Sequence, residues 1–172
     1  LLGLMIGAAL GLAGAAMQGF LRNPLAEPGL IGTSAFSALG AVIALQTGFA
    51  ALHALALPFA ALAGALVSVA LILAIAGPRG GALTLILAGI AISAFATALT
   101  SLVLNLSPNP FAASEIVFWM LGSLADRSML HVSVAAPLIL TGGAVLMMLG
   151  RGLDALTLGE DAAEALGIGL AR

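Results

Sequence analysis

The chain has 172 residues, of which 62% are hydrophobic and only 7% are charged. Ordinary soluble domains carry about 25% charged residues, so this composition excludes a typical soluble protein and favours one embedded in a lipid bilayer. A net charge of −2 with five arginines and no lysine excludes a basic nucleic-acid binder, a P-loop and a Schiff-base lysine. Because the chain has no cysteine, it also lacks disulfides and thiolate metal sites.

Long uncharged stretches predict membrane-spanning helices. Asp, Glu, Lys and Arg are absent from residues 1–21, 28–78, 80–114 and 128–150. A spanning helix needs about 20 apolar residues, so the second stretch has room for two spans, with a break between Gln46 and Pro58. We predict an all-α, polytopic transmembrane helix bundle in residues 1–152, with five spans at 1–21, 30–47, 55–76, 82–106 and 129–149.

The arginines predict the orientation of these spans. Five spans place Arg22, Arg79 and Arg151 on one side of the membrane, next to span ends, and Arg127 on the other side. The positive-inside rule then makes residues 22–29, 77–81 and 151–172 cytoplasmic and residues 107–127 external. The chain starts within an apolar run, so we expect a fragment of a longer membrane protein that lacks at least one preceding span.

The first span carries a row of small residues. Gly3, Gly7 and Gly11 recur every four residues and Ala15 continues the row, which predicts a face for close helix packing. Gln18 lies near the inner end of this face. Its amide has two interpretations, a satisfied hydrogen bond between helices or a polar group at the mouth of a translocation pathway.

The fourth predicted span carries a polar stripe at helical spacing. It consists of Ser93, Thr97, Thr100, Ser101 and Asn105. Hydroxyls in a helix can bond to the carbonyl four residues earlier, which would make the stripe structural. The same stripe is typical of the wall of an aqueous conduit, and both interpretations stay open. The candidate pathway residues are therefore Gln18, Ser93, Thr97, Thr100 and Ser101.

Residues for catalysis are missing from the predicted spans. They contain no aspartate pair and no GxSxG motif, and His53 and His131 both lie near the external interface. We expect no catalytic residue and no metal ligand in this chain. If a solute crosses the membrane here, the energy is expected to come from another subunit.

Four motifs in order carry a resemblance to a known family. The first runs from Gly14 and Gln18 through the turn residues to Gly32, and the turn residues are Asn23, Pro24, Leu25, Ala26 and Pro28. The others are residues 87–91 (LAGIA), 118–124 (FWMLGSL) and 156–167 (LTLGEDAAEALG). Together they resemble the permease family of ATP-binding-cassette importers for iron–siderophore, haem and cobalamin, the FecCD-like type II importers.

The resemblance implies a fold and a set of partners. The family has about ten spans per subunit, and this chain resembles spans two to six. The implied partners are a cytoplasmic ATP-binding-cassette ATPase, a periplasmic or lipid-anchored substrate-binding protein, and a second permease subunit in a homodimer or pseudo-dimer. ATP and magnesium would bind to the ATPase, so no cofactor is expected on this chain, and its location would be the inner membrane.

The segment 153–172 is the implied region of ATPase coupling. The implied coupling residues are Leu158, Gly159, Glu160, Ala162, Leu166 and Gly167. Independently of the resemblance, Gly159 is a suitable N-cap for a short helix, acidic residues in its first turn suit the helix dipole, and Gly167 can end it in the left-handed conformation. The alternative is an amphipathic helix that lies on the membrane.

In the external loop we expect a short helix at Ile116–Leu124, capped by Ser114 and with Glu115 in its first turn. Two other functions remain open at this point. An ion-coupled secondary transporter would need an ionisable residue deep within a span. The five predicted spans hold no Asp or Glu, and their one histidine, His131, lies near the external interface. A structural membrane protein would need no coupling segment.

Overall fold

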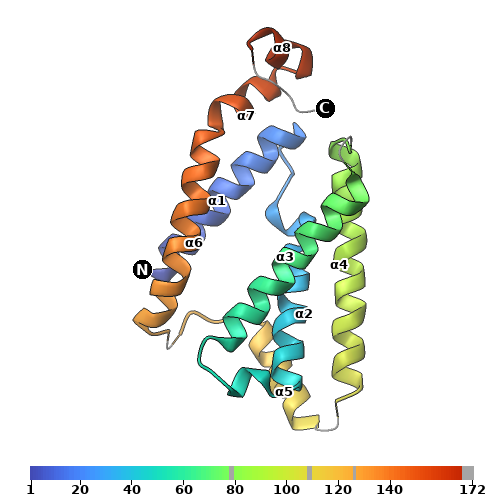
Figure 1. The fold of residues 1–172 in the computed structure, drawn as a ribbon, viewed down its shortest axis with the longest axis vertical. Helices are drawn as coiled ribbons and strands as arrows, with labels where there is room; N and C mark the ends of the chain where they lie inside the picture. Colours follow the sequence, from blue (N-terminus) through green and yellow to red (C-terminus); the bar gives the residue numbers. More distant parts are fainter. Residues whose placement is uncertain (78–79, 108–109, 126, 168–172) are drawn as a thin grey trace. The chain divides into compact units, whose positions relative to one another are not determined.

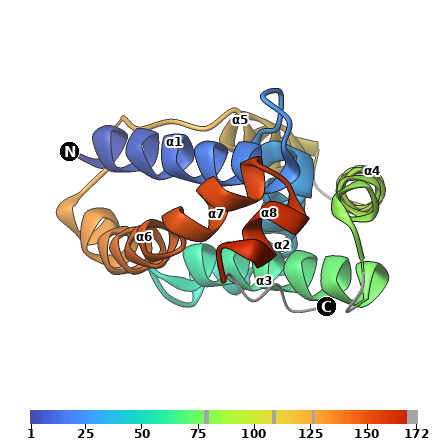
Figure 2. The ribbon, with the colours of Figure 1, turned by 90° about the horizontal axis from the view of Figure 1, so that it is seen from above.

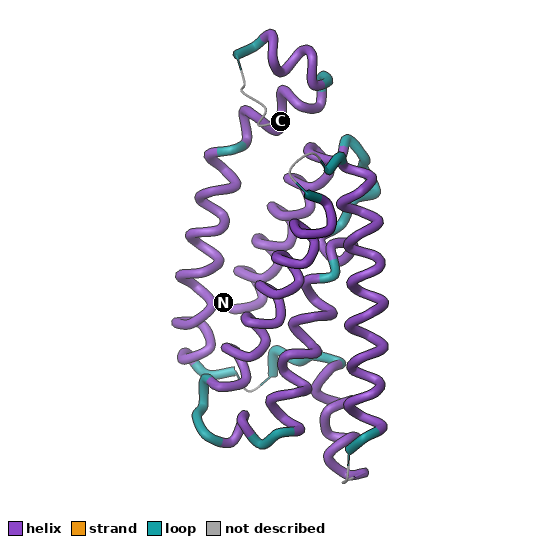
Figure 3. The backbone as a smooth tube through the Cα atoms, turned by 45° about the vertical axis from the view of Figure 1, so that its right-hand side comes forward, coloured by secondary structure: helices purple, strands orange, loops and turns teal. Residues whose placement is uncertain are grey.

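The computed structural model describes residues 1–77, 80–107, 110–125 and 127–167, and it places most of them in helices joined by short turns (Figures 1 and 3). No strand occurs in these ranges, which confirms the predicted all-α fold class. Parts of the predicted loops 77–81 and 107–127, including Arg79, and the end of the segment 153–172 lie outside the described residues.

Among the residues that the structure describes, four helices are long and apolar enough to cross a membrane. They are α1 (Leu2–Leu21), α3 (Ala56–Ala76), α4 (Ala82–Asn105) and α6 (Met129–Met148). Their ends lie within one residue of the ranges predicted from the uncharged stretches. The polar and glycine-rich turns therefore mark the ends of these helices accurately.

The second predicted span, 30–47, has a different form. The short 3-10 helix η1 (Pro28–Ile31) takes up its first residues, and α2 (Thr33–Gln46) has only 14 residues. At about 1.5 Å per residue α2 is about 21 Å long, below the ~30 Å of a hydrocarbon core. A second 3-10 helix, η2 (Phe49–Ala51), follows it before α3 begins. By length alone α2 is a short apolar helix, and it is not among the four candidate spans.

The chain forms two compact units, Leu1–Pro28 with Leu124–Arg172 and Gly29–Ser123. The second unit contains the main hydrophobic core, where α2, α3 and α4 meet (Figure 1). In the first unit α1 packs against α6 and against α7 (Gly150–Thr157), and neither α1 nor α6 has a buried residue. The core residues of the second unit are Phe36, Leu39, Ile72, Ala88, Ile92 and Ala96.

Glycines allow α2 and α3 to approach closely. A Cβ atom added to Gly40 would collide with the carbonyl oxygen of Ala60, and one added to Gly64 would collide with that of Phe36. The small-residue row predicted on α1 is in a different situation, because a Cβ atom at Gly7 or Gly11 would have no neighbour within 4 Å. Close packing through that row stays a prediction.

The short helix α5 (Pro110–Met120) begins and ends earlier than we predicted. Ser114 lies inside it, so the prediction that Ser114 caps the helix is wrong, and the predicted end at Leu124 is also wrong. Proline is favoured in the first turn of a helix, where a backbone N–H would have no helical partner. Pro110 therefore starts the helix before the apolar run that guided the prediction.

A buried hydroxyl in α3 gives a first testable prediction. Ser68 is fully buried, and its Oγ has no hydrogen-bond partner within the described part of the chain. Burying an unpaired hydroxyl costs about 1–3 kcal/mol. We expect Ser68→Ala to leave the free energy of unfolding of the full-length protein in detergent unchanged or to raise it by up to ~1 kcal/mol.

Thr100→Val is the matched comparison. Thr100 is also buried, but its hydroxyl donates to the Ala96 carbonyl at 2.9 Å. Loss of this bond should lower the free energy of unfolding by about 0.5–1.5 kcal/mol. A loss of more than ~1 kcal/mol in Ser68→Ala would contradict the prediction and show that the Ser68 hydroxyl is paired.

Candidate functional site

The proline turn, residues 22–28, is a built structure at the end of α1. Arg22 ends the helix in the left-handed conformation with φ 50°, and its N–H donates to the Gly19 carbonyl at 3.3 Å. The Asn23 side-chain oxygen accepts a bond from the Leu25 N–H at 2.9 Å, which makes an Asx turn. The Ala26 N–H donates to the Asn23 carbonyl at 3.0 Å. The motif residues Asn23 and Ala26 thus have a structural role.

Gln18 ties this turn to the helix. Its side-chain Nε2 donates to the Ala26 carbonyl at 3.4 Å, and its own carbonyl accepts the Asn23 N–H at 3.2 Å. The Gln18 side chain thus bonds to the turn and not to another helix, and its place at the mouth of a pathway stays a prediction. Ala26 is buried, whereas Leu25 is 82% exposed at the tip. The turn therefore exposes the apolar side chain of Leu25.

Two family motifs meet at glycines in the second unit. Gly32 is buried with φ 75°, and an added Cβ atom would lie 2.8 Å from Ser93 Oγ and 2.9 Å from the Gly89 carbonyl oxygen. A Cβ atom at Gly89 would collide with the Leu30 carbonyl oxygen. The end of the turn motif and the LAGIA motif of α4 therefore form one contact that requires glycine on both sides.

The structure divides the polar stripe of α4. Thr97 and Ser101 are exposed, Ser93 is half-buried beside Gly32, and Thr100 is buried. The hydroxyls of Thr97 and Thr100 donate to the carbonyls four residues earlier at 2.8 and 2.9 Å, and the Asn105 amide does the same at 2.9 Å. Such bonds agree with the structural interpretation. Only Thr97, Ser101 and Asn105 face outward from the unit, so a lining role could rest on those three.

The tail segment, residues 150–167, consists of two short helices, α7 (Gly150–Thr157) and α8 (Glu160–Ala165). Gly159 is the N-cap of α8 with φ 110°, and Gly167 follows its end with φ 80°, so both glycines lie where we predicted. Each helix buries an alanine, Ala155 and Ala163.

The six coupling candidates all lie in or next to α8. Leu158 and Leu166 flank the helix and are 70% and 65% exposed. Ala162 is half-buried within it. Glu160 is the first residue of α8, and its side chain is not among those that the structure describes. The tail segment thus presents two leucines beside a short acidic helix.

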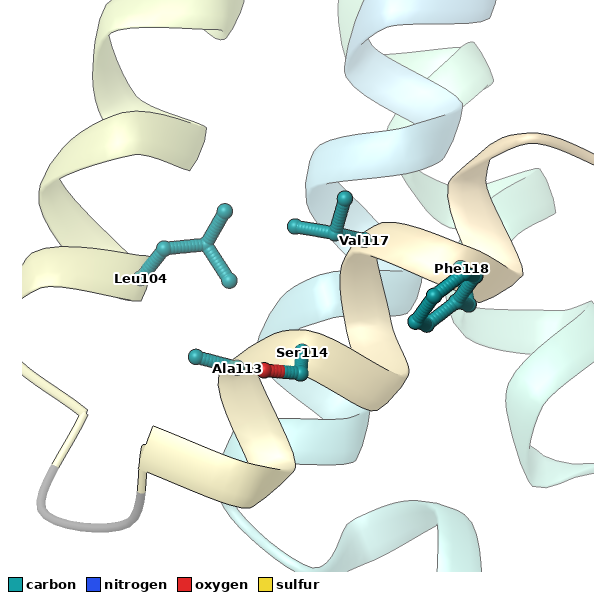
Figure 4. Close-up of a pocket in the computed structure, with 5 residues that line it drawn as sticks. All are labelled: Leu104, Ala113, Ser114, Val117 and Phe118. Atoms are coloured by element: carbon teal, nitrogen blue, oxygen red, sulfur yellow. The ribbon is translucent and has the colours of Figure 1, made fainter.

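A shallow apolar hollow lies between the end of α4 and α5. Its volume is about 310 Å³, and Figure 4 shows Leu104 of α4 facing Val117 of α5 across it. The motif FWMLGSL begins in α5 and continues beyond its end, where Gly122 takes a φ of 75°. The remaining lining residues are Ala113, Ser114 and Phe118.

Sequence reasoning missed α7. The signal was present, because Leu153 and Leu156 are three residues apart, as on one face of a helix, and polar residues lie between and beside them.

Within the described ranges, no three His, Asp or Glu side chains gather into a group that could hold a metal ion.

Comparison with known proteins identifies the family. The model of the FecCD transport family matches residues 1–172. The ferric enterobactin transport system permease protein FepD of Escherichia coli is 42% identical over 178 residues, which cover 100% of this chain and 52% of FepD. The cobalamin import system permease protein BtuC of Halobacterium salinarum is 34% identical over 173 residues, which cover 99% of this chain and 46% of that protein.

A solved structure supports the same assignment. An inward-facing metal-chelate type ABC transporter matches with a TM-score of 0.87 and 32% sequence identity, over 98% of this chain and 53% of that one. The chain thus spans about half the length of the relatives it matches. Since the family model covers every residue, the chain belongs to the FecCD transport family.

Proposed function

We propose that this chain is part of the permease subunit of an ATP-binding-cassette importer in the inner membrane, which moves a metal chelate inward by alternating access. The observation that carries the proposal is the match of the FecCD family model to all 172 residues. The four helices of the described part of the chain that are long and apolar enough to cross a membrane support it. In this proposal residues 22–29, 77–81 and 151–172 face the cytoplasm and residues 107–127 face outward.

The chain has a non-catalytic role in this proposal. ATP hydrolysis would take place on a partner ATPase that binds ATP and magnesium, and the tail segment would dock on that ATPase. The two exposed leucines beside α8, Leu158 and Leu166, support this role because exposed apolar side chains on a short rigid element suit a groove in a partner. A substrate-binding protein on the outer side and a second permease subunit would complete the importer.

We propose an iron–siderophore, haem or cobalamin-type chelate as the substrate. The printed names of the relatives include ferric enterobactin and cobalamin, which supports the class and does not select one member. A pathway lined by hydroxyls and without fixed charges suits a bulky chelate whose metal keeps its own ligands. The lining candidates that their exposure supports are Thr97 and Ser101.

Uptake in proteoliposomes tests the proposal. The full-length permease is assembled with the ATPase and the binding protein encoded beside it, and labelled ferric siderophore, haem and cobalamin are supplied one at a time. We expect uptake of one of them that needs ATP and stops with a non-hydrolysable analogue. Uptake driven by an ion gradient without ATP would instead indicate a secondary transporter, and no uptake of any of them would leave a structural role.

The lining role predicts the effect of larger side chains on α4. Thr97→Leu and Ser101→Leu should each lower uptake about threefold or more, because pore diameter and lining groups control passage through a transporter. Both side chains are exposed, so stability should change little. Ser133→Leu on α6 is the control, since Ser133 is exposed and its hydroxyl also bonds within its own helix. Equal uptake in all three variants would contradict a lining role.

A further inference from the structure

The tail segment touches α1 at a glycine. Helix α7 lies beside the C-terminal end of α1 (Figures 1 and 2). A Cβ atom added to Gly19 would lie 3.7 Å from Leu153 Cβ and 3.8 Å from the Leu153 carbonyl oxygen. These are ordinary van der Waals separations, so a methyl group would fit at Gly19, where α1 lies against the Cβ atom and the backbone of Leu153. Leu153 is half-buried.

The same turn of α1 holds the proline turn. The Gly19 carbonyl accepts the Arg22 N–H, and the neighbouring Gln18 accepts the Asn23 N–H and donates to the Ala26 carbonyl. Two adjacent residues of α1 are thus bonded to the turn, and one of them also contacts α7. A displacement of α7 toward α1 would therefore act directly on the residues of α1 that are bonded to the turn.

Helix α8 is joined closely to α7. Only Leu158 and Gly159 separate them, the two helices pack against each other, and each contributes a buried alanine. Packed interfaces of this kind transmit rigid-body displacements because they have few intermediate arrangements. The described contacts therefore run without interruption from α8 through α7 and Gly19 to the proline turn.

We propose that Leu153 is a positioning residue that transmits movement of the tail segment to the proline turn through Gly19. The proposal rests on the proposed function, in which the tail segment docks on the ATPase. Leu153 does not touch substrate or ATP in this proposal. Its half-buried side chain extends beyond the Cβ atom that lies at Gly19. Alanine keeps that Cβ atom and removes the rest, and we expect movement of α7 to be absorbed in the space that is left.

Truncation of Leu153 tests the proposal in the reconstituted full-length importer. Leu153→Ala should assemble with the ATPase and hydrolyse ATP at the wild-type rate, while uptake per ATP hydrolysed falls about 3- to 10-fold, a change of the size that substitutions between coupled sites cause. Gly152→Ala is the matched control, because it adds a methyl group one residue away where nothing lies within 4 Å. An unchanged ratio in Leu153→Ala would overturn the proposal.

A disulfide provides a second, reciprocal test. The Cβ separation of 3.7 Å at this contact matches disulfide geometry, and the chain has no cysteine of its own. The double variant Gly19→Cys/Leu153→Cys lacks the leucine when reduced, so uptake per ATP should fall as in Leu153→Ala. Oxidation should restore it about 3- to 10-fold, because the bond joins α7 to α1 again.

Each outcome of the disulfide test has a definite meaning. Failure of the disulfide to form would overturn the contact itself, and a formed disulfide that leaves uptake per ATP low or lowers it further would overturn the transmission. The single variants Gly19→Cys and Leu153→Cys control for the substitutions and for thiols elsewhere in the assembly. If the wild type shows no ATP-dependent uptake, the proposed function fails, and that result is distinct from a failure confined to the variants.

Discussion

Replacing Gly32 by alanine is expected to lower the free energy of unfolding of the full-length protein by about 2–5 kcal/mol. Two costs add at this position. The backbone has φ 75°, which costs a residue with a Cβ atom about 1–2 kcal/mol. The new methyl group would also lie 2.8 Å from Ser93 Oγ and 2.9 Å from the Gly89 carbonyl oxygen, and overpacking costs about 1–3 kcal/mol.

Gly48→Ala separates these two costs. Gly48 has φ 76°, nearly the value of Gly32, and an added Cβ atom there would have nothing within 4 Å. It should therefore lose only the conformational cost of about 1–2 kcal/mol. Unfolding of both variants in a denaturing detergent series measures the difference. Equal losses in the two variants would show that the contact between Gly32 and α4 yields at no cost.

The uncharged stretches of the sequence predicted the ends of most helices correctly, but they did not predict the ends of α2. Helices α1, α3, α4 and α6 end at glycines, polar turns or charged residues that the sequence displays openly. Between Glu27 and Arg79 there is no charge, so only length suggested where the second helix begins and ends. The 3-10 helix at Pro28–Ile31 is too short to show a periodic pattern of apolar residues. The residues that Gly32 contacts after it, Gly89 and Ser93, belong to α4, far along the chain.

The polar stripe of α4 shows a second limit, which concerns the candidate site. At about 100° per residue, the five residues of the stripe cover an arc of about 140° around the helix, with Thr100 at one edge and Asn105 at the other. Periodicity defines this arc and does not say which edge of it faces the core. The core lies on the side of Ala96, so Thr100 at the nearer edge is buried and Ser101 is exposed. Only packing against α2 and α3 makes that distinction.

The contact between Gly19 and Leu153 could not be predicted for a related reason. An isolated glycine in an apolar helix carries no signal for its neighbour, and the two residues are far apart in the sequence. The cap of α8 was predictable because its signals are local. A glycine, an acidic turn and a second glycine follow one another within nine residues, and each has a preferred place at a helix end.

Replacing Gly159 by alanine is expected to lower ATP-dependent uptake about tenfold or more, a factor that corresponds to about 1.4 kcal/mol. Gly159 links α7 to α8 with φ 110° and ψ 157°. This region of backbone conformation is open essentially to glycine alone, and other residues held there lose about 1–3 kcal/mol. The alanine variant should relieve the strain by changing the angle between the two helices. Leu158 and Leu166 would then no longer present the same surface to the ATPase.

Asparagine distinguishes this mechanism from a general loss of glycine. Asn tolerates the ordinary left-handed conformation, so Gly167→Asn, at φ 80° after the end of α8, should keep most of its uptake. Gly159→Asn should fail like Gly159→Ala, because ψ 157° lies outside that conformation. Binding of the ATPase to the full-length permease, measured beside uptake, should fall in both Gly159 variants and in neither Gly167→Asn nor Gly152→Ala. If Gly159→Asn bound the ATPase normally, the angle between α7 and α8 would not control docking.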